Sequence, residues 1–249
     1  MIFLNSPLPD YCRFPTKREV QFANESRLTK LSCPAHTFHS TDHAGKDDQD
    51  RVVTLQQAEG QLDRCVLAPK AITLKVSSSS THLLRTVTHY DLQVGAQVML
   101  IKVRAEATLY ATQNLTIGQN AVQGVLVNGS VGKVTDFLTC QEAKEVHGIE
   151  VVLSPRDKEK NPKTGEIRIA ENLWRDHTKW PAVEFPNDRK VLVPPFEFTI
   201  ENVSGSMQAL RVQVPLMLAW AISIHKSQGQ TLQRVRVNLG KIFEKGQGQ

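Results

Sequence analysis

The feature that most limits the fold of this 249-residue chain is a series of short β-branched segments between residues 71 and 200. They are bounded by Gly, Pro, Asn or Asp, which are the residues that turns prefer. An Asn128-Gly129 dipeptide, typical of a tight hairpin turn, separates two of them. Many short strands with turn residues between them predict a small barrel or sandwich rather than a βαβ series. The predicted strands are Ala71–Lys75, Gln97–Lys102, Gly124–Val127, Gly132–Asp136, Ile149–Leu153, Ala182–Phe185, Lys190–Val193 and Glu197–Ile200.

The two ends of the chain have a different pattern. Apolar residues at helical spacing predict a helix over Lys17–Leu31, opened by a capping box of Thr16 and Glu19 and stopped by Pro34. A second helix is predicted around Thr54–Cys65, and residues 156–168 are expected to form a solvated loop. Near the end, helical spacing predicts a helix over Pro215–Gln228, and alternation predicts a strand over Val235–Leu239. A helical start, a β-rich middle and a helix–strand finish indicate one fold that is interrupted by another.

Composition excludes several classes of protein. Apolar residues make up 40% and charged residues 22% of the chain, which is typical of a globular protein and not of a disordered one. No apolar run approaches the roughly 18–20 residues that span a bilayer, and the first ten residues lack the features of a signal peptide. The net charge of +5 permits a polyanionic partner without requiring one. The cysteines are too irregularly spaced for a disulfide framework, so we expect them to be reduced: Cys12, Cys33, Cys65 and Cys140.

Two motifs resemble functional sites but lack the residues that such sites require. Gly129–Val134 approaches a phosphate-binding P-loop, but it has too few residues between its glycines and no hydroxyl after Lys133, so we interpret it as a hairpin turn. Cysteine and histidine side chains at Cys33, His36, His39 and His43 could attract zinc, but no second Cys/His pair follows, and no metal site is assigned. Esterase elbows and HExxH zinc motifs do not occur in the sequence, and no catalytic residue is assigned.

One segment, Leu218–Leu232 (LAWAISIHKSQGQTL), is dense in chemically useful side chains. On a helix Ser223, Lys226 and Ser227 would share one side, and hydroxyls beside an ammonium can hold phosphate oxygens. The same pattern also fits a buried helix with a polar tip, and the residues alone leave both interpretations open.

This segment resembles motif V of the PIF family of DNA helicases (superfamily 1B, RecD-like), whose pattern is LAWA-x-[ST]-IHKSQG-x-TL. Further segments resemble family patterns in the family's order and together cover most of the chain. They are a PT-x-x-EV-x-x-x-N-x-x-RL helix, a VGAQVMLIK strand, an LVNG-x-x-G-x-V hairpin, a WPVV-x-F strand and the strand and loop after motif V, at Pro15–Leu31, Val94–Lys102, Leu126–Val134, Trp180–Phe185 and Val235–Gln247.

The resemblance implies an α/β fold: a partial RecA-like, P-loop-type domain (2A) interrupted by a small SH3-like β-barrel (2B). Residues 1–123 would form the first part of 2A, 124–205 the 2B barrel, and 206–249 the return to 2A with motif V. Carried over, the DNA-binding residues would be Ser223, His225, Lys226 and Ser227, and the nucleotide-binding residues Gln228 and Gly229.

The resemblance also implies a carboxy-terminal fragment of an ATP-dependent 5′-to-3′ DNA helicase. Such a parent enzyme uses ATP and Mg²⁺, acts in DNA repair, recombination or telomere maintenance, and works in the nucleus, with the mitochondrion as a second compartment. The expected partners are single-stranded DNA and the missing amino-terminal RecA-like domain, and no membrane. The sequence holds neither the family's P-loop nor its motif VI arginine, so we expect this chain alone to be inactive. The alternatives are a stand-alone module that binds single-stranded nucleic acid or another partner without catalysis, and an inert gene remnant.

Two stretches interrupt the family pattern. Deleting 76–93 or 103–113 restores it, and each stretch begins with Val and ends with Gln, as a retained in-frame intron would. Retained introns and surface insertions are therefore both open for these segments.

Overall fold

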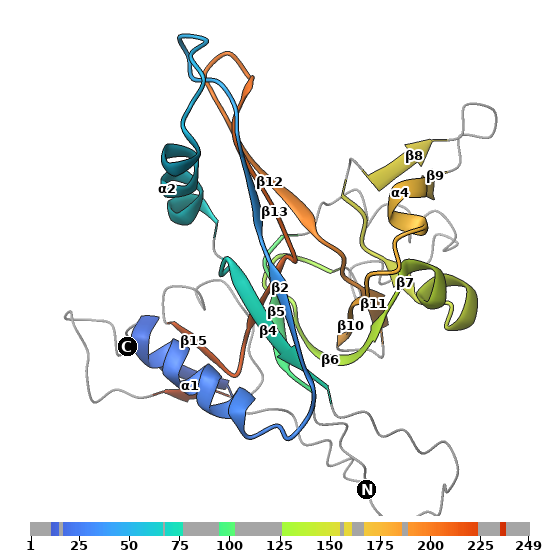
Figure 1. The fold of residues 1–249 in the computed structure, drawn as a ribbon. Coiled ribbons are helices and arrows are strands. Elements are labelled where there is room, and N and C mark those ends of the chain that lie inside the picture. Colours follow the sequence, from blue (N-terminus) through green and yellow to red (C-terminus); the bar gives the residue numbers. More distant parts are fainter. Residues whose placement is uncertain are drawn as a thin grey trace, which may run out of the picture.

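The computed structural model describes residues 11–14, 17–66, 68–76, 95–102, 126–154, 157–160, 167–185, 189–223 and 235–237. Both interrupting stretches lie almost entirely outside these ranges, so their origin stays a hypothesis. Within the described residues the molecule is a mixed, sheet-rich α/β structure (Figure 1).

A six-stranded sheet forms the largest element and holds the main core. Its strands follow the order β14-β5-β6-β10-β11-β7, so β5 and β14 join it from positions far apart in the chain. The pairs are antiparallel except β11 with β7. The main apolar cluster includes the fully buried Leu74, Val98, Val134, Val183 and Leu216. The strands are β5 (Gln97–Leu100), β6 (Val131–Leu138), β7 (Glu150–Val151), β10 (Trp180–Phe185), β11 (Arg189–Leu192) and β14 (Leu216–Leu218).

A second sheet projects from the body and carries a helix on one side (Figure 1). Strands β3 (Thr41–Ala44), β12 (Phe196–Glu201) and β13 (Met207–Gln213) pair antiparallel in the order β12-β13-β3. Helix α2 (Leu55–Cys65) packs on it through a cluster that includes Leu62 and Ala209. The helix begins with a capping box between Thr54 and Gln57, which satisfies backbone donors of its first turn.

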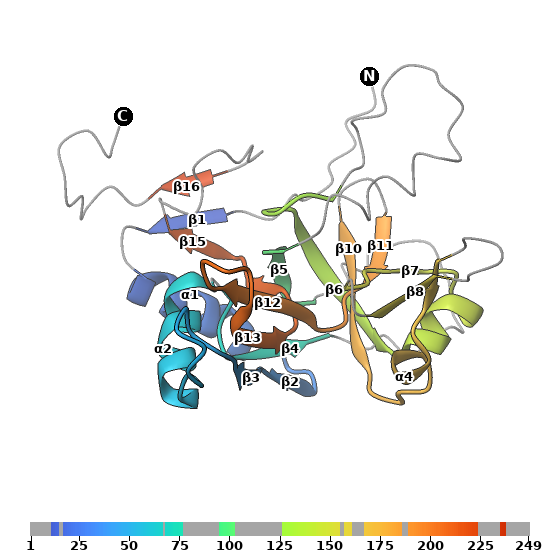
Figure 2. The same ribbon diagram turned by 90° about the horizontal axis from the view of Figure 1, so that it is seen from above.

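The third sheet is parallel and lies at one side of the molecule (Figure 2). Strand β1 (Tyr11–Phe14) pairs with β15 (Ala221–Ser223) on one side and β16 (Val235–Val237) on the other. Helix α1 (Lys17–Thr29) follows β1 and contacts β15. The sheet therefore brings together the two ends of the described chain.

The remaining elements are short. A two-stranded antiparallel sheet of β2 (Ala35–His39) and β4 (Ala71–Lys75) packs on the six-stranded sheet, where His36 stacks on Phe137 with ring centroids 4.1 Å apart. The others are the π-helix η1 (Glu142–Val146), the helical turn α4 (Glu171–Trp174) and the hairpin of β8 (Lys158–Lys160) with β9 (Ile167–Ile169).

Most predicted elements are confirmed with small shifts in their ends. The helices at Lys17–Thr29 and Leu55–Cys65 are present, and the strand over Ala71–Lys75 has the predicted bounds. The turn at Asn128-Gly129 is also present, with Gly129 at φ 94° and the Ser130 amide donating to the Val127 carbonyl. Thr16 of the proposed capping box lies outside the described residues.

Two local predictions are wrong, and the barrel is not confirmed. Leu126 and Val127 are not in a strand, and residues 156–168, expected to be a loop, contribute to the β8–β9 hairpin. The strands of the described ranges form open sheets and no closed barrel. The domain boundaries at 123/124 and 205/206 stay a prediction.

Candidate functional site

The carboxyl edge of the parallel sheet carries the first candidate site residue. Ser223 ends β15 beside Phe14, the last residue of β1, and α1 starts at Lys17, just after β1 ends. Because β1 and β15 are parallel, their carboxyl ends meet at one edge, where open α/β sheets bind ligands. This edge therefore holds both Ser223 and the beginning of α1 (Figure 2).

The predicted helix over Pro215–Gln228 is wrong in its described part. Leu216–Leu218 and Ala221–Ser223 form strands, which pair with β5 and β1 respectively. The segment is apolar on every side, and such a run cannot be assigned to helix or strand by periodicity alone. Strands β5 and β1 supply hydrogen-bond partners for the backbone of these residues, and the residues therefore adopt the extended conformation.

This correction changes the argument for the motif V residues. Ser223 lies at a strand end, so the helical face that it was expected to share with Lys226 and Ser227 does not begin there. The other predicted residues lie outside the described ranges, and their roles stay predictions: His225, Lys226, Ser227, Gln228 and Gly229.

Two buried side-chain amides hold the segment that leads to Ser223. Asn24 of α1 accepts a hydrogen bond from the Ala221 amide at 2.8 Å and donates to the Ala221 carbonyl at 3.0 Å. The side-chain amide of Gln97 in β5 donates to the Ala219 carbonyl at 3.1 Å. The backbone carbonyl of Gln97 accepts from the Ala219 backbone amide at 2.9 Å. Both amides are about 95% buried. They satisfy backbone groups that would otherwise be buried without partners, and so they fix the path of the chain into the edge.

Sequence reasoning missed the role of these amides. Asn24 belongs to the helix pattern and Gln97 to the VGAQ pattern that resemble the family, so the structure joins three separate motifs through two side chains. A signal was present at one of them, because Asn24 lies on the helix stripe with Val20, Leu28 and Leu31. A polar residue on such a stripe indicates a buried hydrogen-bond partner.

A cavity of about 490 Å³ lies along α1 on the side that faces Ser223. One face of α1, the start of β4 and the chain around β14 and β15 form its walls. Its lining residues are Lys17, Val20, Gln21, Asn24, Glu25, Leu28, Pro69, Ala71, Ile72, Thr73, Met217, Leu218 and Ser223.

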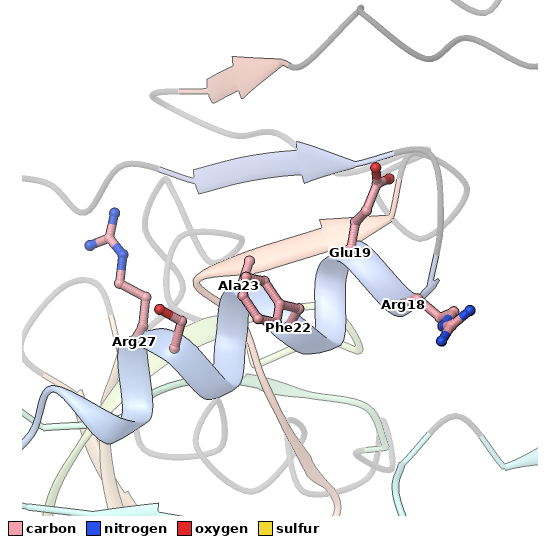
Figure 3. A pocket seen from close by; sticks show the side chains of 6 residues that line it. Arg18, Glu19, Phe22, Ala23 and Arg27 are labelled. Atoms are coloured by element: carbon pink, nitrogen blue, oxygen red, sulfur yellow. The ribbon is translucent and has the colours of Figure 1, made fainter.

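The opposite face of α1 carries a second, separate hollow of about 570 Å³ (Figure 3). Phe22 stands at its middle with 75% of its surface exposed, and Arg18 and Arg27 extend at either side of it. The two hollows share no lining residue, because they lie on opposite faces of α1 and each is lined by the side chains of one face.

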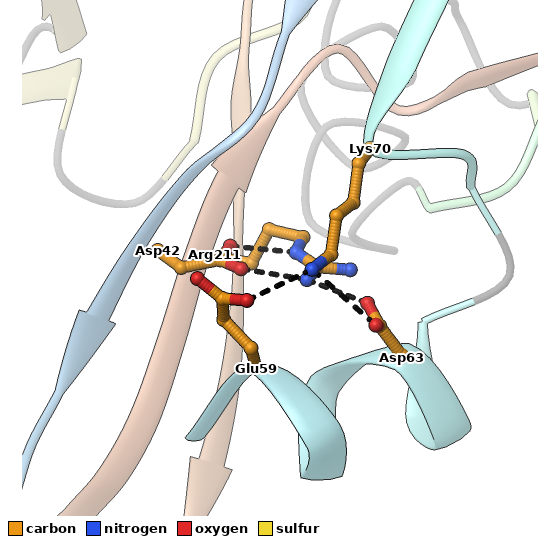
Figure 4. Close-up of polar contacts among 5 residues, drawn as sticks. All are labelled: Asp42, Glu59, Asp63, Lys70 and Arg211. Atoms are coloured by element: carbon orange, nitrogen blue, oxygen red, sulfur yellow. Dashed lines mark hydrogen bonds and ion pairs between the residues drawn. The ribbon is translucent and has the colours of Figure 1, made fainter. Parts of the chain in front are cut away.

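An ion-pair network fixes α2 to the projecting sheet (Figure 4). Arg211 of β13 is 1% exposed and binds Asp42 of β3 with two hydrogen bonds of 2.6 and 2.7 Å. Its second contact is Asp63 of α2 at 2.8 Å, and Lys70 bridges Asp63 to Glu59. Partial burial alone would raise the pKa of Asp63, but hydrogen bonds from Arg211 and Lys70 outweigh it and lower that pKa.

The cysteine and histidine cluster of the sequence is spread over the structure. His36 and His39 lie in β2 and His43 in β3, while Cys33 precedes β2. Among the described side chains no group of three or more His, Cys, Asp or Glu residues converges in a way that could hold a metal. No helix of the described chain is long and apolar enough to cross a membrane.

Comparison with known proteins gives clear relatives. No protein-family profile matches the chain. An ATP-dependent DNA helicase PIF1 from Emericella nidulans is 35% identical over 250 residues, which cover 94% of this chain and 27% of the relative. The PIF1 helicase of Saccharomyces cerevisiae is 30% identical over 98% of this chain and 33% of its own length. The crystal structure of the Candida albicans Pif1 helicase superposes with a TM-score of 0.59 at 29% identity, over 98% of this chain and 42% of that one.

These relatives place the chain first in a class: it is homologous to ATP-dependent DNA helicases over nearly its whole length. Within that class it belongs to the Pif1 family. The chain spans about a quarter to a third of the length of the curated relatives that it matches. The family resemblance of the sequence motifs is therefore confirmed.

Proposed function

We propose that this chain is the carboxy-terminal part of a Pif1-type 5′-to-3′ DNA helicase and contributes its single-stranded DNA contact. The observation that carries the proposal is the 35% identity to a named ATP-dependent DNA helicase over 94% of the chain. The carboxyl edge supports it, because Ser223 and the beginning of α1 lie where sheets of this kind bind ligands. Ser223, His225, Lys226 and Ser227 would contact the DNA backbone, and Gln228 and Gly229 would face the nucleotide.

We further propose that the parallel sheet with α1 corresponds to the RecA-like 2A domain and that residues 124–205 correspond to the inserted SH3-like 2B unit. The parent enzyme would use ATP and Mg²⁺ in DNA repair, recombination or telomere maintenance. Among the described residues no group of three or more His, Cys, Asp or Glu side chains could hold a metal ion, so we assign Mg²⁺ to none of them. ATP hydrolysis would require the P-loop and arginine that this sequence lacks, and the amino-terminal RecA-like domain would be the partner that supplies the P-loop.

The proposal is tested by fluorescence anisotropy of a labelled single-stranded oligonucleotide at several salt concentrations. We expect binding whose logarithm falls linearly with the logarithm of salt concentration, since phosphate contacts release counterions. The variant Lys226→Ala should weaken binding and reduce that slope by about one. Lys144→Ala, at an exposed position of η1, is the matched control and should bind like the wild type.

Phosphate release measured with ATP, Mg²⁺ and the same oligonucleotide tests the second half of the proposal. This chain alone should release none above background. A folded sample that fails to bind single strands would contradict the DNA contact. DNA-stimulated phosphate release by this chain would contradict the assignment of ATP hydrolysis to the amino-terminal RecA-like domain. Nuclear localisation, with a mitochondrial pool, is tested by imaging a fluorescent fusion of the chain.

A further inference from the structure

The sheet of β3, β12 and β13 projects from the body of the molecule together with α2 and ends in two loops (Figure 1). One loop leads from β3 to α2, and the other joins β12 to β13. The two loops and the residues beside them, 45–55 and 201–207, are called the arm tip below. Four of the seven large apolar residues that are exposed in the described part of the chain lie here: Val52, Leu55, Val203 and Met207.

The apolar residues of the arm tip lie close together. Lys46 forms a β-bridge with Val52 on one side, and on the other side its amide donates to the Met207 carbonyl at 3.1 Å. Val52 and Met207 are therefore two strand spacings apart, or roughly 10 Å. Leu55 begins α2 three residues after Val52. Single exposed apolar residues are normal on a protein surface, whereas several at one place indicate an interaction site.

Hydrogen bonds hold the two loops of the arm tip together. The buried Asn202 side chain donates to the Asp47 carbonyl at 3.2 Å and accepts from the Ser206 amide at 2.7 Å. Asp48 of the first loop accepts from the Val203 amide of the second at 2.7 Å, and Val203 is 93% exposed. The apolar side chains are thus presented from a fixed backbone. A surface that is ordered before binding loses less conformational freedom when a partner docks on it.

The projecting sheet and α2 are acidic, although the chain is basic as a whole. Residues 41–65 and 196–213 hold eight of the 25 acidic side chains and only four of the 30 basic ones, in a chain of net charge +5. Glu201 pairs with Met207 across the hairpin, which places a carboxylate beside the apolar residues. Such a surface repels nucleic-acid phosphates and a second copy of itself, and it attracts Lys and Arg side chains. Exposed carboxylates of the arm tip are Asp48, Asp50 and Glu201.

We propose that the arm tip is a docking surface for a helix of a partner protein that carries an apolar stripe with Lys or Arg beside it. The stripe would cover Val52, Leu55 and Met207, and the basic side chains would face Asp50 and Glu201. The span fits a helix, because residues seven positions apart share one face and lie about 10.5 Å apart along the axis. The surface belongs to a different sheet from the carboxyl edge, so the proposal does not depend on the DNA contact proposed above.

Two labelled peptides titrated with the full chain test the proposal by fluorescence anisotropy. Each has about 18 residues, long enough for a helix. The Lys peptide has Leu at helical spacing with Lys beside the Leu stripe, and the Glu peptide has Glu in place of every Lys. We expect the Lys peptide to bind with an affinity that falls as the salt concentration rises, and the Glu peptide not to bind.

Variants of the arm tip separate specific docking from general charge attraction. Val52→Ser and Met207→Ser should each weaken binding of the Lys peptide about five- to tenfold, because each removes an apolar contact. Asp50→Asn and Glu201→Gln should each weaken it about two- to fivefold and reduce its salt dependence. Asp50→Asn preserves the backbone, because Asn also adopts the left-handed conformation that Asp50 has at φ 59°. Val146→Ser is the matched control, since this valine lies on η1 and is similarly exposed to Val52.

The outcomes are distinct once circular dichroism has confirmed that each variant is folded. Binding of the Lys peptide that Val52→Ser weakens and Val146→Ser leaves unchanged supports the docking surface. Equal binding to both variants, binding of both peptides, or no binding of either peptide overturns it. Sedimentation velocity of the chain alone and anisotropy of a labelled single strand test the other occupants. Self-association or strand binding that Val52→Ser and Met207→Ser weaken would assign the arm tip to a second copy or to DNA and overturn the proposal. Strand binding should be the same in all arm-tip variants, so its presence or absence in wild type bears only on the proposed function.

Discussion

At the scale of single residues, Asn24 has the largest structural role near the candidate site. Its amide group pairs with both backbone groups of Ala221 and reaches the Leu218 carbonyl at 3.4 Å. We expect Asn24→Ala to lower the free energy of unfolding by about 2–4 kcal/mol, because it leaves buried backbone groups without partners. Urea unfolding measures this, and Gln21→Ala, at an exposed position of the same helix, should change stability by less than about 0.5 kcal/mol. Equal effects of both substitutions would show that the amide does not hold the segment.

Arg211 gives a second prediction at this scale. Removing it would leave the carboxylate of Asp42, whose side chain is only 8% exposed, buried without its cation. We expect Arg211→Ala to cost about 3–5 kcal/mol in chemical denaturation. Lys46→Ala, which breaks an exposed ion pair with Asp50, is the control and should cost less than about 1 kcal/mol. A small effect of Arg211→Ala would mean that the projecting sheet relaxes around Asp42.

The same network predicts acid sensitivity. The folded-state pKa of Asp63 is lower than its ordinary value, because the hydrogen bonds from Arg211 and Lys70 outweigh the desolvation of the carboxyl. A depressed carboxyl pKa stabilises the fold above the unfolded pKa of about 3.9, and this contribution is lost as the pH falls through the folded value. The stability advantage of wild type over Asp63→Asn should therefore be present at pH 6 and shrink below about pH 4. Urea midpoints across this pH range measure it, and a constant difference would contradict the assignment.

At the scale of elements, two glycines give opposite predictions for the same substitution. A Cβ at Gly95 would lie 1.8 Å from the Val134 carbonyl oxygen, so β6 and the chain before β5 approach closely only because the residue is glycine. We expect Gly95→Ala to destabilise the protein by about 1–3 kcal/mol. Gly60 lies within α2 with nothing near its Cβ position, so Gly60→Ala should stabilise by about 0.5–1 kcal/mol. Thermal melts of the two variants test both signs, and a stable Gly95→Ala would show that the strands can separate at low cost.

Elements that depend on local signals were predictable from sequence. Helix α1 follows the spacing of Val20, Asn24 and Leu28, and β4 has the predicted bounds because turn residues flank its β-branched run. The residues before Ser223 lacked such a signal. They are apolar at every position, so only their partners β5 and β1 decided that they form strands.

At the scale of the whole molecule, Cys140 reports on the integrity of the core. It is fully buried in a cluster with Leu138, Leu173 and Leu192, and burial raises the pKa of its thiol to about 12. Since the thiolate is the reactive form, native protein at pH 8 should be alkylated at the exposed Cys65 and spared at Cys140. Mass spectrometry after a short pulse of iodoacetamide measures this, with the Cys65→Ser variant as the control. Modification of Cys140 at the rate of Cys65 would indicate that the core opens in the native state.

The sequence by itself determined the family, the sheet-rich α/β class and about half of the helices and strands of the described chain, because these depend on short-range spacing and on motifs read along the chain. The tertiary structure decided which distant segments meet. Asn24 reaches Ala221 across 197 positions and Arg211 faces Asp42 across 169, contacts that no local pattern encodes. It also decided that the approach to Ser223 is extended, because buried backbone groups need hydrogen-bond partners and neighbouring strands supplied them.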